Sequence, residues 1–183
     1  MLIESHGRAV VLIDGANLFQ TAKSLQFDID FRKFRAFIAS QTDVLRFCYY
    51  TAMVDEEQQN PLRPLVDFLS YNGFKVVTKQ VREFTDSTGA RRMRGNMDME
   101  IAIGALEAAS YVDHVILFSG DGDFVPVVEA LQRRGIFVTV VSSTATKPAF
   151  AADELRRTAD QFVELDKLKV HIERDRRSEA DEG

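Results

Sequence analysis

The apolar and polar positions of the chain follow two different periods. Continuous runs of β-branched and aromatic residues, such as 8–13, are typical of strands buried in a parallel sheet. Stretches in which apolar residues recur every three or four positions, such as 31–40, are typical of helices with one buried face. We expect strands at residues 8–13, 44–51, 74–81, 114–119, 136–142 and, at a short edge, 162–165. We expect helices at residues 17–25, 31–40, 61–71, 97–110, 124–134 and 148–160.

Strands and helices alternate throughout this pattern. Because parallel strands need a crossover connection, the alternation predicts a mostly parallel sheet with helices on both faces. The sequence therefore predicts the α/β class, as one three-layer α/β/α domain over residues 8–166 that follows an N-terminal extension, 1–7. We interpret residues 82–94 as a polar loop or hairpin tip. Residues 167–183 carry five basic and five acidic side chains, and we expect a frayed helix that ends in disorder.

Acidic residues follow two of the expected strands at the point where each strand ends. Asp14 comes directly after the first strand, and Asp121 and Asp123 come after the fourth. The carboxyl ends of parallel strands lie at one edge of a sheet, where ligands of such folds bind. Asp98 joins this group if the third strand and its loop bring the start of the next helix to the same edge. Asn17 could add a neutral amide oxygen there.

Four carboxylates in one cleft repel one another, so the fold needs a shared proton, a basic residue or a bound cation. Oxygen ligands without histidine or cysteine suit Mg²⁺ or Mn²⁺. Each aspartate alone also has an ordinary explanation. Asp14 could end a strand in a turn, Asp98 could favour a helix N-terminus, and Asp121 or Asp123 could cap a helix. Their joint position at corresponding strand ends favours a shared metal site.

Charge and composition narrow the function classes. The chain has one cysteine and three histidines, which excludes an internal disulfide and a cysteine zinc cage. No apolar run reaches the roughly 20 residues that a membrane helix needs, so we expect no membrane partner and a cytoplasmic location. The net charge of −5 argues against tight, nonspecific duplex binding. The segment 75–94, however, has six basic and two acidic residues, a net +4 that suits either a phosphodiester substrate or a solvated hairpin tip.

Three segments in this order carry a family resemblance: Val11-Leu12-Ile13-Asp14-Gly15-Ala16-Asn17, Arg94-Gly95-Asn96-Met97-Asp98-Met99-Glu100 and Ser119-Gly120-Asp121-Gly122-Asp123-Phe124. Over about residues 8–166 the chain resembles the NYN domain family, the LabA-like branch of the PIN-like nuclease superfold. The resemblance implies a PIN-like α/β/α domain with a metal-dependent ribonuclease site. It matches Asp14, Asp98 and Asp121 to the metal-binding acidic positions, with Asp123 and Asn17 in support. It also implies a phosphate contact by Arg94, where relatives often have lysine.

The chain departs from the family pattern at one position. Many relatives carry another aspartate in the helix after Asp98, and here that position is Gly104. The change could weaken a second metal site, or Glu100 could take over part of its role. Gly104 therefore favours an alternative function, a weakly active or inactive RNA-binding or regulatory module that retains the acidic metal pocket.

The leading hypothesis is a divalent-metal-dependent endoribonuclease that acts on single-stranded or locally structured RNA. Asp14, Asp98 and Asp121 would hold Mg²⁺ or Mn²⁺, and Asp123 would complete the ligand set or orient the attacking water. The expected substrate-binding residues are Asn17, Ser119, Arg91, Arg92 and Arg94. A phosphohydrolase acting on small nucleotides is a third possibility, and a homodimer is left open.

Overall fold

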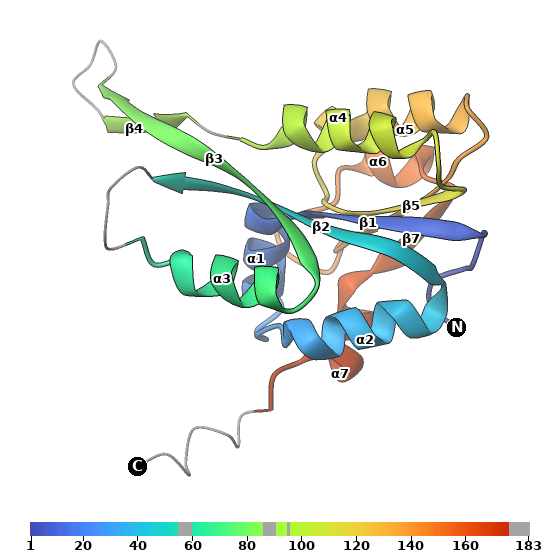
Figure 1. Cartoon of the computed structure of the whole chain (residues 1–183), viewed down its shortest axis with the longest axis horizontal. Coiled ribbons are helices and arrows are strands. Elements are labelled where there is room, and N and C mark those ends of the chain that lie inside the picture. The colour runs from blue at the N-terminus through green and yellow to red at the C-terminus, as the bar shows by residue number, and fades with distance from the viewer. Residues whose placement is uncertain (55–59, 86–90, 95, 176–183) are drawn as a thin grey trace.

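The computed structural model of the chain describes residues 1–54, 60–85, 91–94 and 96–175 (Figure 1). Within these residues, seven strands form one sheet in the order β4-β3-β2-β1-β5-β6-β7. The strands are β1 Arg8–Asp14, β2 Asp43–Val54, β3 Phe74–Thr85, β4 Arg91–Arg94, β5 His114–Phe118, β6 Phe137–Ser142 and β7 Gln161–Glu164. All neighbouring pairs are parallel except β3 and β4, which are antiparallel.

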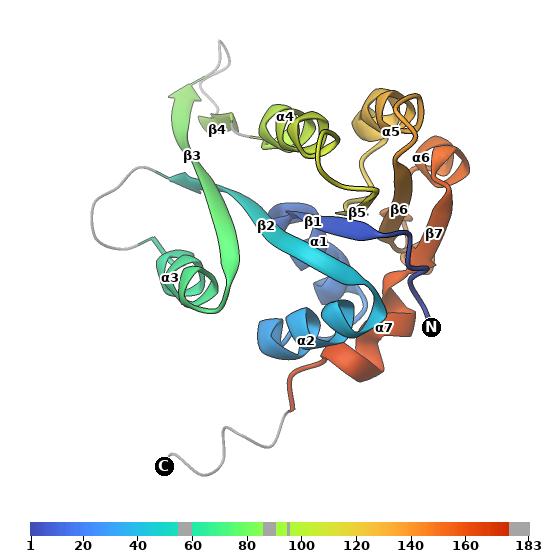
Figure 2. The same ribbon diagram turned by 45° about the vertical axis from the view of Figure 1, so that its right-hand side comes forward.

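Helices cover both faces of the sheet (Figures 1 and 2). One layer contains α1 Gly15–Ser24, α2 Phe31–Gln41, α3 Arg63–Tyr71 and α7 Leu165–Ile172. The opposite layer contains α4 Asp98–Ala108, α5 Val125–Gln132 and α6 Asp153–Thr158, and a short 3₁₀ turn, η1, spans Gly122–Phe124. This confirms the predicted three-layer α/β/α architecture with a mostly parallel sheet.

Alternation along the central strands explains the two cores. In β1, Val11 and Ile13 pack into the core beneath α1, α2 and α7, whereas Val10 and Leu12 pack into the core beneath α4 and α5. Successive side chains of a strand point to opposite faces, so a strand covered on both sides is apolar at every position. The continuous apolar run that predicted the first strand therefore reflects burial on both faces.

One predicted helix was much longer than the helix observed. The helix expected at 148–160 is only α6, Asp153–Thr158. The residues before it form a loop, because the backbone N–H groups of Phe150 and Ala151 donate to the Ser143 carbonyl and that of Ala152 donates to the Gly120 carbonyl. Tertiary hydrogen bonds thus replace the first turn of the expected helix. At 82–94, the described backbone forms a hairpin, with β4 paired to residues 82–85.

The start of the expected charged tail is part of the folded domain. Residues 167–172 continue α7, and its side chains Leu168 and Ile172 are completely buried. Leu165 joins them at helical spacing, so α7 has a buried apolar face despite its charged residues. The backbone of Arg174 then donates to the Asp28 carbonyl, and Lys33 pairs with Asp175 at 2.8 Å. The expected disorder concerns residues 176–183, which lie outside the described part of the chain.

In the part of the chain that the structure describes, none of the helices combines the length and apolar character required to cross a bilayer.

Candidate metal centre

The candidate site lies where β1 and β5 end side by side. Ile13 of β1 pairs with Phe118 of β5, so the residues that follow both strands leave the sheet at the same level. Asp14 is the last residue of β1 and the N-cap of α1, and its Oδ1 accepts a hydrogen bond from the Asn17 backbone N at 3.1 Å. The predicted meeting of the two strand ends is therefore present.

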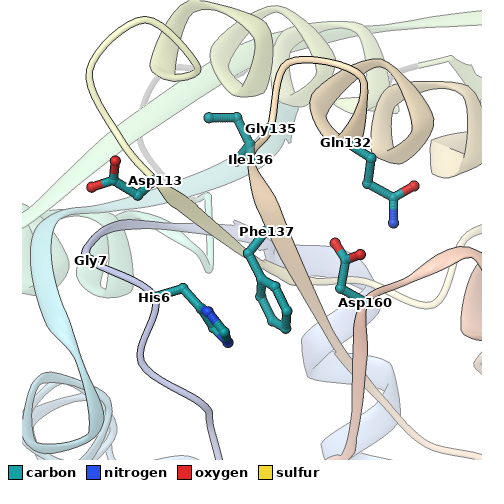
Figure 3. Close-up of a pocket in the computed structure, with 8 residues that line it drawn as sticks. All are labelled: His6, Gly7, Asp113, Gln132, Gly135, Ile136, Phe137 and Asp160. Carbon is teal, nitrogen blue, oxygen red and sulfur yellow. The ribbon is translucent and has the colours of Figure 1, made fainter.

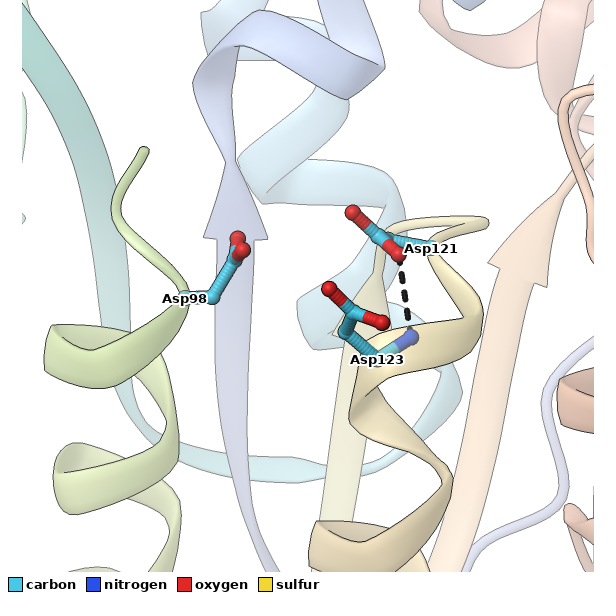
Figure 4. Close-up of side chains that lie close together, drawn as sticks. All are labelled: Asp98, Asp121 and Asp123. Carbon is cyan, nitrogen blue, oxygen red and sulfur yellow. Dashed lines mark hydrogen bonds between the residues drawn. The ribbon is translucent and has the colours of Figure 1, made fainter. Parts of the chain in front are cut away.

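Three carboxylates converge at this edge. Asp98, Asp121 and Asp123 each offer a ligand oxygen, and these oxygens lie within 4.8 Å of one another (Figure 4). Asp98 begins α4, whereas Asp121 caps η1 and its Oδ1 accepts a hydrogen bond from the Asp123 backbone N at 3.0 Å. We call Asp98, Asp121 and Asp123 the acidic cluster. Asp14, the fourth predicted aspartate, lies beside the cluster but outside this group of three.

Burial and the neighbouring negative charges change the pKa of Asp98. Burial, followed by the charges of Asp121, Asp14 and Asp123, raises the pKa of Asp98 to about 6. Burial also raises the pKa of Asp14, opposed by hydrogen bonds from Asn17 and Ser119. Among the described side chains, no lysine or arginine forms an ion pair with the three cluster carboxylates. A bound cation would relieve this repulsion, and an all-oxygen donor set suits a hard divalent ion.

Two polar side chains hold the strand ends together. Ser119 is 1% exposed, and its Oγ donates to Asp14 Oδ2 at 3.2 Å while it accepts from the Asp121 backbone N at 3.3 Å. Asn17 Oδ1 accepts a hydrogen bond from the Gly120 backbone N at 3.1 Å. Both residues were predicted to bind substrate. The structure places them in contacts that position Asp14 and the loop carrying Asp121.

Two contacts near Asp98 were not predicted. The side-chain amide of Asn96 donates a hydrogen bond to Asp98 Oδ2. Glu100, which could have replaced the missing family aspartate, instead pairs with Lys79 of β3 at 2.9 Å, and this hydrogen bond lowers the Glu100 pKa. The contact of Asn96 could have been predicted, because this residue stands two positions before Asp98 in a motif of the sequence. The ion pair between β3 and α4 could not, because no sequence spacing indicates it.

The structure explains the glycine at position 104. Tyr50, the strand neighbour of Asp14 on β2, points toward α4, and a Cβ atom at position 104 would overlap its hydroxyl oxygen. Tyr50 is 4% exposed, and burial raises its pKa. The space that a side chain at position 104 would need is therefore taken by a buried tyrosine.

The three predicted substrate-binding arginines, Arg91, Arg92 and Arg94, all belong to β4. The described backbone places this strand in a hairpin with β3 that leads into α4 (Figure 1). Contacts of these arginine side chains with phosphate stay predictions.

A different hollow, of about 570 Å³, opens at the other edge of the sheet, before β1, β5, β6 and β7 begin (Figure 3). Its two carboxylates are engaged separately: Asp113 accepts from the Arg8 backbone N at 2.9 Å, and Asp160 accepts from the Val138 backbone N at 2.8 Å. They lie on opposite sides of the His6 and Phe137 rings, which stack 3.6 Å apart. This hollow therefore does not gather its carboxylates as the acidic cluster does.

Comparisons with known proteins show what the whole chain is similar to. The profile of the NYN domain matches residues 8–166. The low amplitude and bright protein LabA of Synechococcus elongatus is 31% identical over 176 residues, which cover 94% of this chain and 91% of that protein. A crystal structure of a protein of unknown function from Vibrio parahaemolyticus superposes with a TM-score of 0.72 at 26% identity, over 90% of this chain and 96% of that one.

Proposed function

This chain belongs to the NYN domain family, and we propose that it is a divalent-metal-dependent ribonuclease that cleaves RNA internally at the acidic cluster. NYN domains are typically nucleases, so the family supports a role on nucleic acid. The observation that carries the proposal is the approach of Asp98, Asp121 and Asp123 to within 4.8 Å at the carboxyl edge of the sheet.

The donor set fits a divalent cation. Three carboxylate oxygens converge, and the charges of Asp121, Asp14 and Asp123 add to the effect of burial in raising the Asp98 pKa. Asp98, Asp121 and Asp123 would hold Mg²⁺ or Mn²⁺, with Asp14 beside them as the fourth acidic group. The ion would supply polarisation of the scissile phosphate and a lowered pKa of water at neutral pH.

The neighbouring residues have positioning roles in this proposal. Ser119 fixes the Asp14 carboxylate, and Asn17 fixes the loop that carries Asp121 through Gly120. Asn96 orients Asp98. We propose that Arg91, Arg92 and Arg94 draw the RNA backbone toward the cluster, because basic side chains supply most phosphate contacts in such complexes.

The test is cleavage of single-stranded and structured RNA in Mn²⁺ by the wild type and by Asp121→Asn. The proposal expects cleavage by the wild type and at least a hundredfold slower cleavage by the variant. Asp67→Asn is the matched control, because this exposed aspartate lies on α3 and its ion pair in the described part of the chain is with Arg63, at 3.7 Å. Equal cleavage by the wild type and Asp121→Asn would refute the site assignment.

One observation favours a second candidate, a metal-stabilised RNA-binding or regulatory module without efficient catalysis. Tyr50 occupies the space that a side chain at Gly104 would need, at the position where the resemblance to the family implies an aspartate in many relatives. This candidate predicts that Mg²⁺ raises the melting temperature while no RNA is cleaved. A homodimer and a cytoplasmic location stay predictions.

A further inference from the structure

The helical layer of α1, α2 and α3 contains a hollow of about 440 Å³ that the proposed chemistry does not use. Four aromatic side chains contribute to its wall: Phe19 from α1, Phe27 from the following loop, Phe31 from the start of α2 and Tyr49 from β2. We call it the aromatic hollow. We propose that it binds a nucleobase of a single-stranded RNA substrate, an inference that rests on the proposed function and adds a binding subsite to it.

Phe19 is the ring that offers its face to a planar ligand, because Phe27 and Tyr49 are only 5% and 4% exposed and form the base of the hollow. Phe31 meets Tyr49 edge to face, with ring centroids 5.7 Å apart. Phe19 is 62% exposed although it is large and apolar. Stacking of a base on an aromatic side chain is the usual way in which proteins hold single strands without reading their sequence. An exposed phenylalanine beside a cavity of this size is suited to that contact.

Cationic side chains border the hollow. Among the described residues that line it, Lys23 and Arg174 are basic and Asp28 is acidic. A second hollow, of about 520 Å³, adjoins the first and shares Phe31, Leu65 and Arg174 with it. The second hollow adds one acidic residue, Asp30, and one basic residue, Arg32, whose guanidinium lies 5.3 Å from the centre of the Phe68 ring. Aromatic surfaces beside basic groups match the alternating bases and phosphates of a single strand.

The aromatic hollow is connected to the candidate metal centre through Tyr49 and α1. A Cβ atom at Gly15 would lie 2.6 Å from the Tyr49 hydroxyl, so this ring lies against the residue that follows Asp14. The charge of Asp14, after burial, contributes to raising the Tyr49 pKa to about 12. Helix α1, which supplies Phe19 and Lys23, is capped by Asp14 itself. In this proposal, a strand bound at the acidic cluster passes Asp14 and extends over the start of α1 toward the hollow.

The chain itself has no obvious apolar segment to fill the hollow. The residues outside the described ranges, 55–59, 86–90, 95 and 176–183, include no apolar side chain larger than alanine. The hollow is thus suited to a separate molecule. Lys23, Arg32 and Arg174 outnumber Asp28 and Asp30 around the two hollows, and this surplus of basic side chains favours a nucleotide over an apolar protein segment.

The test is the binding of a fluorescein-labelled octauridylate, followed by fluorescence anisotropy in EDTA so that no metal contributes. Phe19→Ala and Arg174→Gln are each expected to raise the Kd about five- to tenfold, the loss typical of one stacked base or one phosphate contact. Tyr71→Ala is the control, because Tyr71 is 90% exposed on α3 and does not line the hollow. Melting temperatures equal to that of the wild type would show that the exposed substitutions leave the fold intact.

Wild-type affinity in both Phe19→Ala and Arg174→Gln would overturn the inference, as would no measurable binding by the wild type. The same holds if the hollow captures only an apolar peptide and the octauridylate does not compete. The Asp121→Asn variant separates this inference from the proposed function. Binding that depends on Phe19 in a protein that cleaves no RNA would leave the subsite standing while the nuclease proposal fails.

Discussion

Ser119 Oγ donates a hydrogen bond to Asp14 Oδ2 across 3.2 Å and thereby joins the ends of β5 and β1. The same oxygen accepts from the backbone N of Asp121, so one buried hydroxyl contacts two acidic positions of the site. A single side chain therefore fixes the relative positions of two aspartates that are 107 positions apart in the sequence.

Replacing the Ser119 hydroxyl tests whether these two hydrogen bonds support metal binding and RNA cleavage. Ser119→Ala removes the donor to Asp14 and the acceptor for Asp121, and we expect Mn²⁺ affinity and RNA cleavage to fall about 10- to 100-fold, as for other groups that orient metal ligands. Mn²⁺ binding by titration calorimetry measures the effect. Ser70→Ala is the control, since among the described residues this exposed hydroxyl donates its hydrogen bond to the Val66 carbonyl within α3. Unchanged metal affinity in Ser119→Ala would show that Asp14 does not depend on this contact.

Metal binding should stabilise the fold through the acidic cluster. A ligand at a hundred times its Kd stabilises a protein by about 2.7 kcal/mol, which corresponds to a rise of about 5–10 °C in melting temperature for a chain of this length. We expect this rise when Mn²⁺ is added to the wild type and its near-complete loss in Asp121→Asn. Differential scanning fluorimetry with and without Mn²⁺ measures it. The same rise in both proteins would place the ion elsewhere.

The raised pKa of Asp98 predicts a pH-dependent stability in EDTA. Between the ordinary value of 3.8 and about 6, the folded protein binds more protons at Asp98 than the unfolded chain does. The contribution of Asp98 to the free energy of unfolding is therefore favourable at low pH and is lost as the pH rises through this range. Asp98→Asn, which stays neutral, should melt a few degrees above the wild type at neutral pH, and the difference should shrink toward pH 4. A difference independent of pH would contradict this explanation.

The packing of Tyr50 against α4 predicts opposite effects of one substitution in two backgrounds. Alanine is favoured over glycine inside a helix by about 1 kcal/mol, but a Cβ atom at Gly104 would overlap the Tyr50 hydroxyl. Gly104→Ala should therefore lower the free energy of unfolding, since overpacking typically costs about 1–3 kcal/mol. In a Tyr50→Phe background the overlapping oxygen is gone, and the same change should stabilise the protein. Urea denaturation of the four proteins gives both values, and destabilisation in both backgrounds would mean that the hydroxyl is not the obstacle.

The layers of the fold and part of the site follow from local rules. Asp14 and Asp121 could be placed together because each follows an apolar run, and parallel strands end at a common edge. The sequence could place Asp98 at the same edge only under a condition. Its position depends on how the β3–β4 hairpin directs the chain into α4, and no periodicity of the sequence determines that direction.

The remaining features depend on contacts between elements distant in sequence. The role of Ser119 depends on a hydrogen bond between two strand ends, and the ion pair of Glu100 depends on the position of Lys79 on a neighbouring strand. The short α6 reflects competition between helical and tertiary hydrogen bonds at Ala152. We expected the end of helix α7 to fray because it is rich in charged residues, but Leu168 and Ile172 give it a buried apolar face.

The most direct measurement of the central claim follows RNA cleavage and Mn²⁺ binding in the same buffer, over one series of Mn²⁺ concentrations. We predict that the cleavage rate of the wild type saturates as the Mn²⁺ site fills, and that Asp121→Asn loses both Mn²⁺ binding and RNA cleavage. Cleavage that persists in EDTA, or in a variant that no longer binds Mn²⁺, would contradict the account.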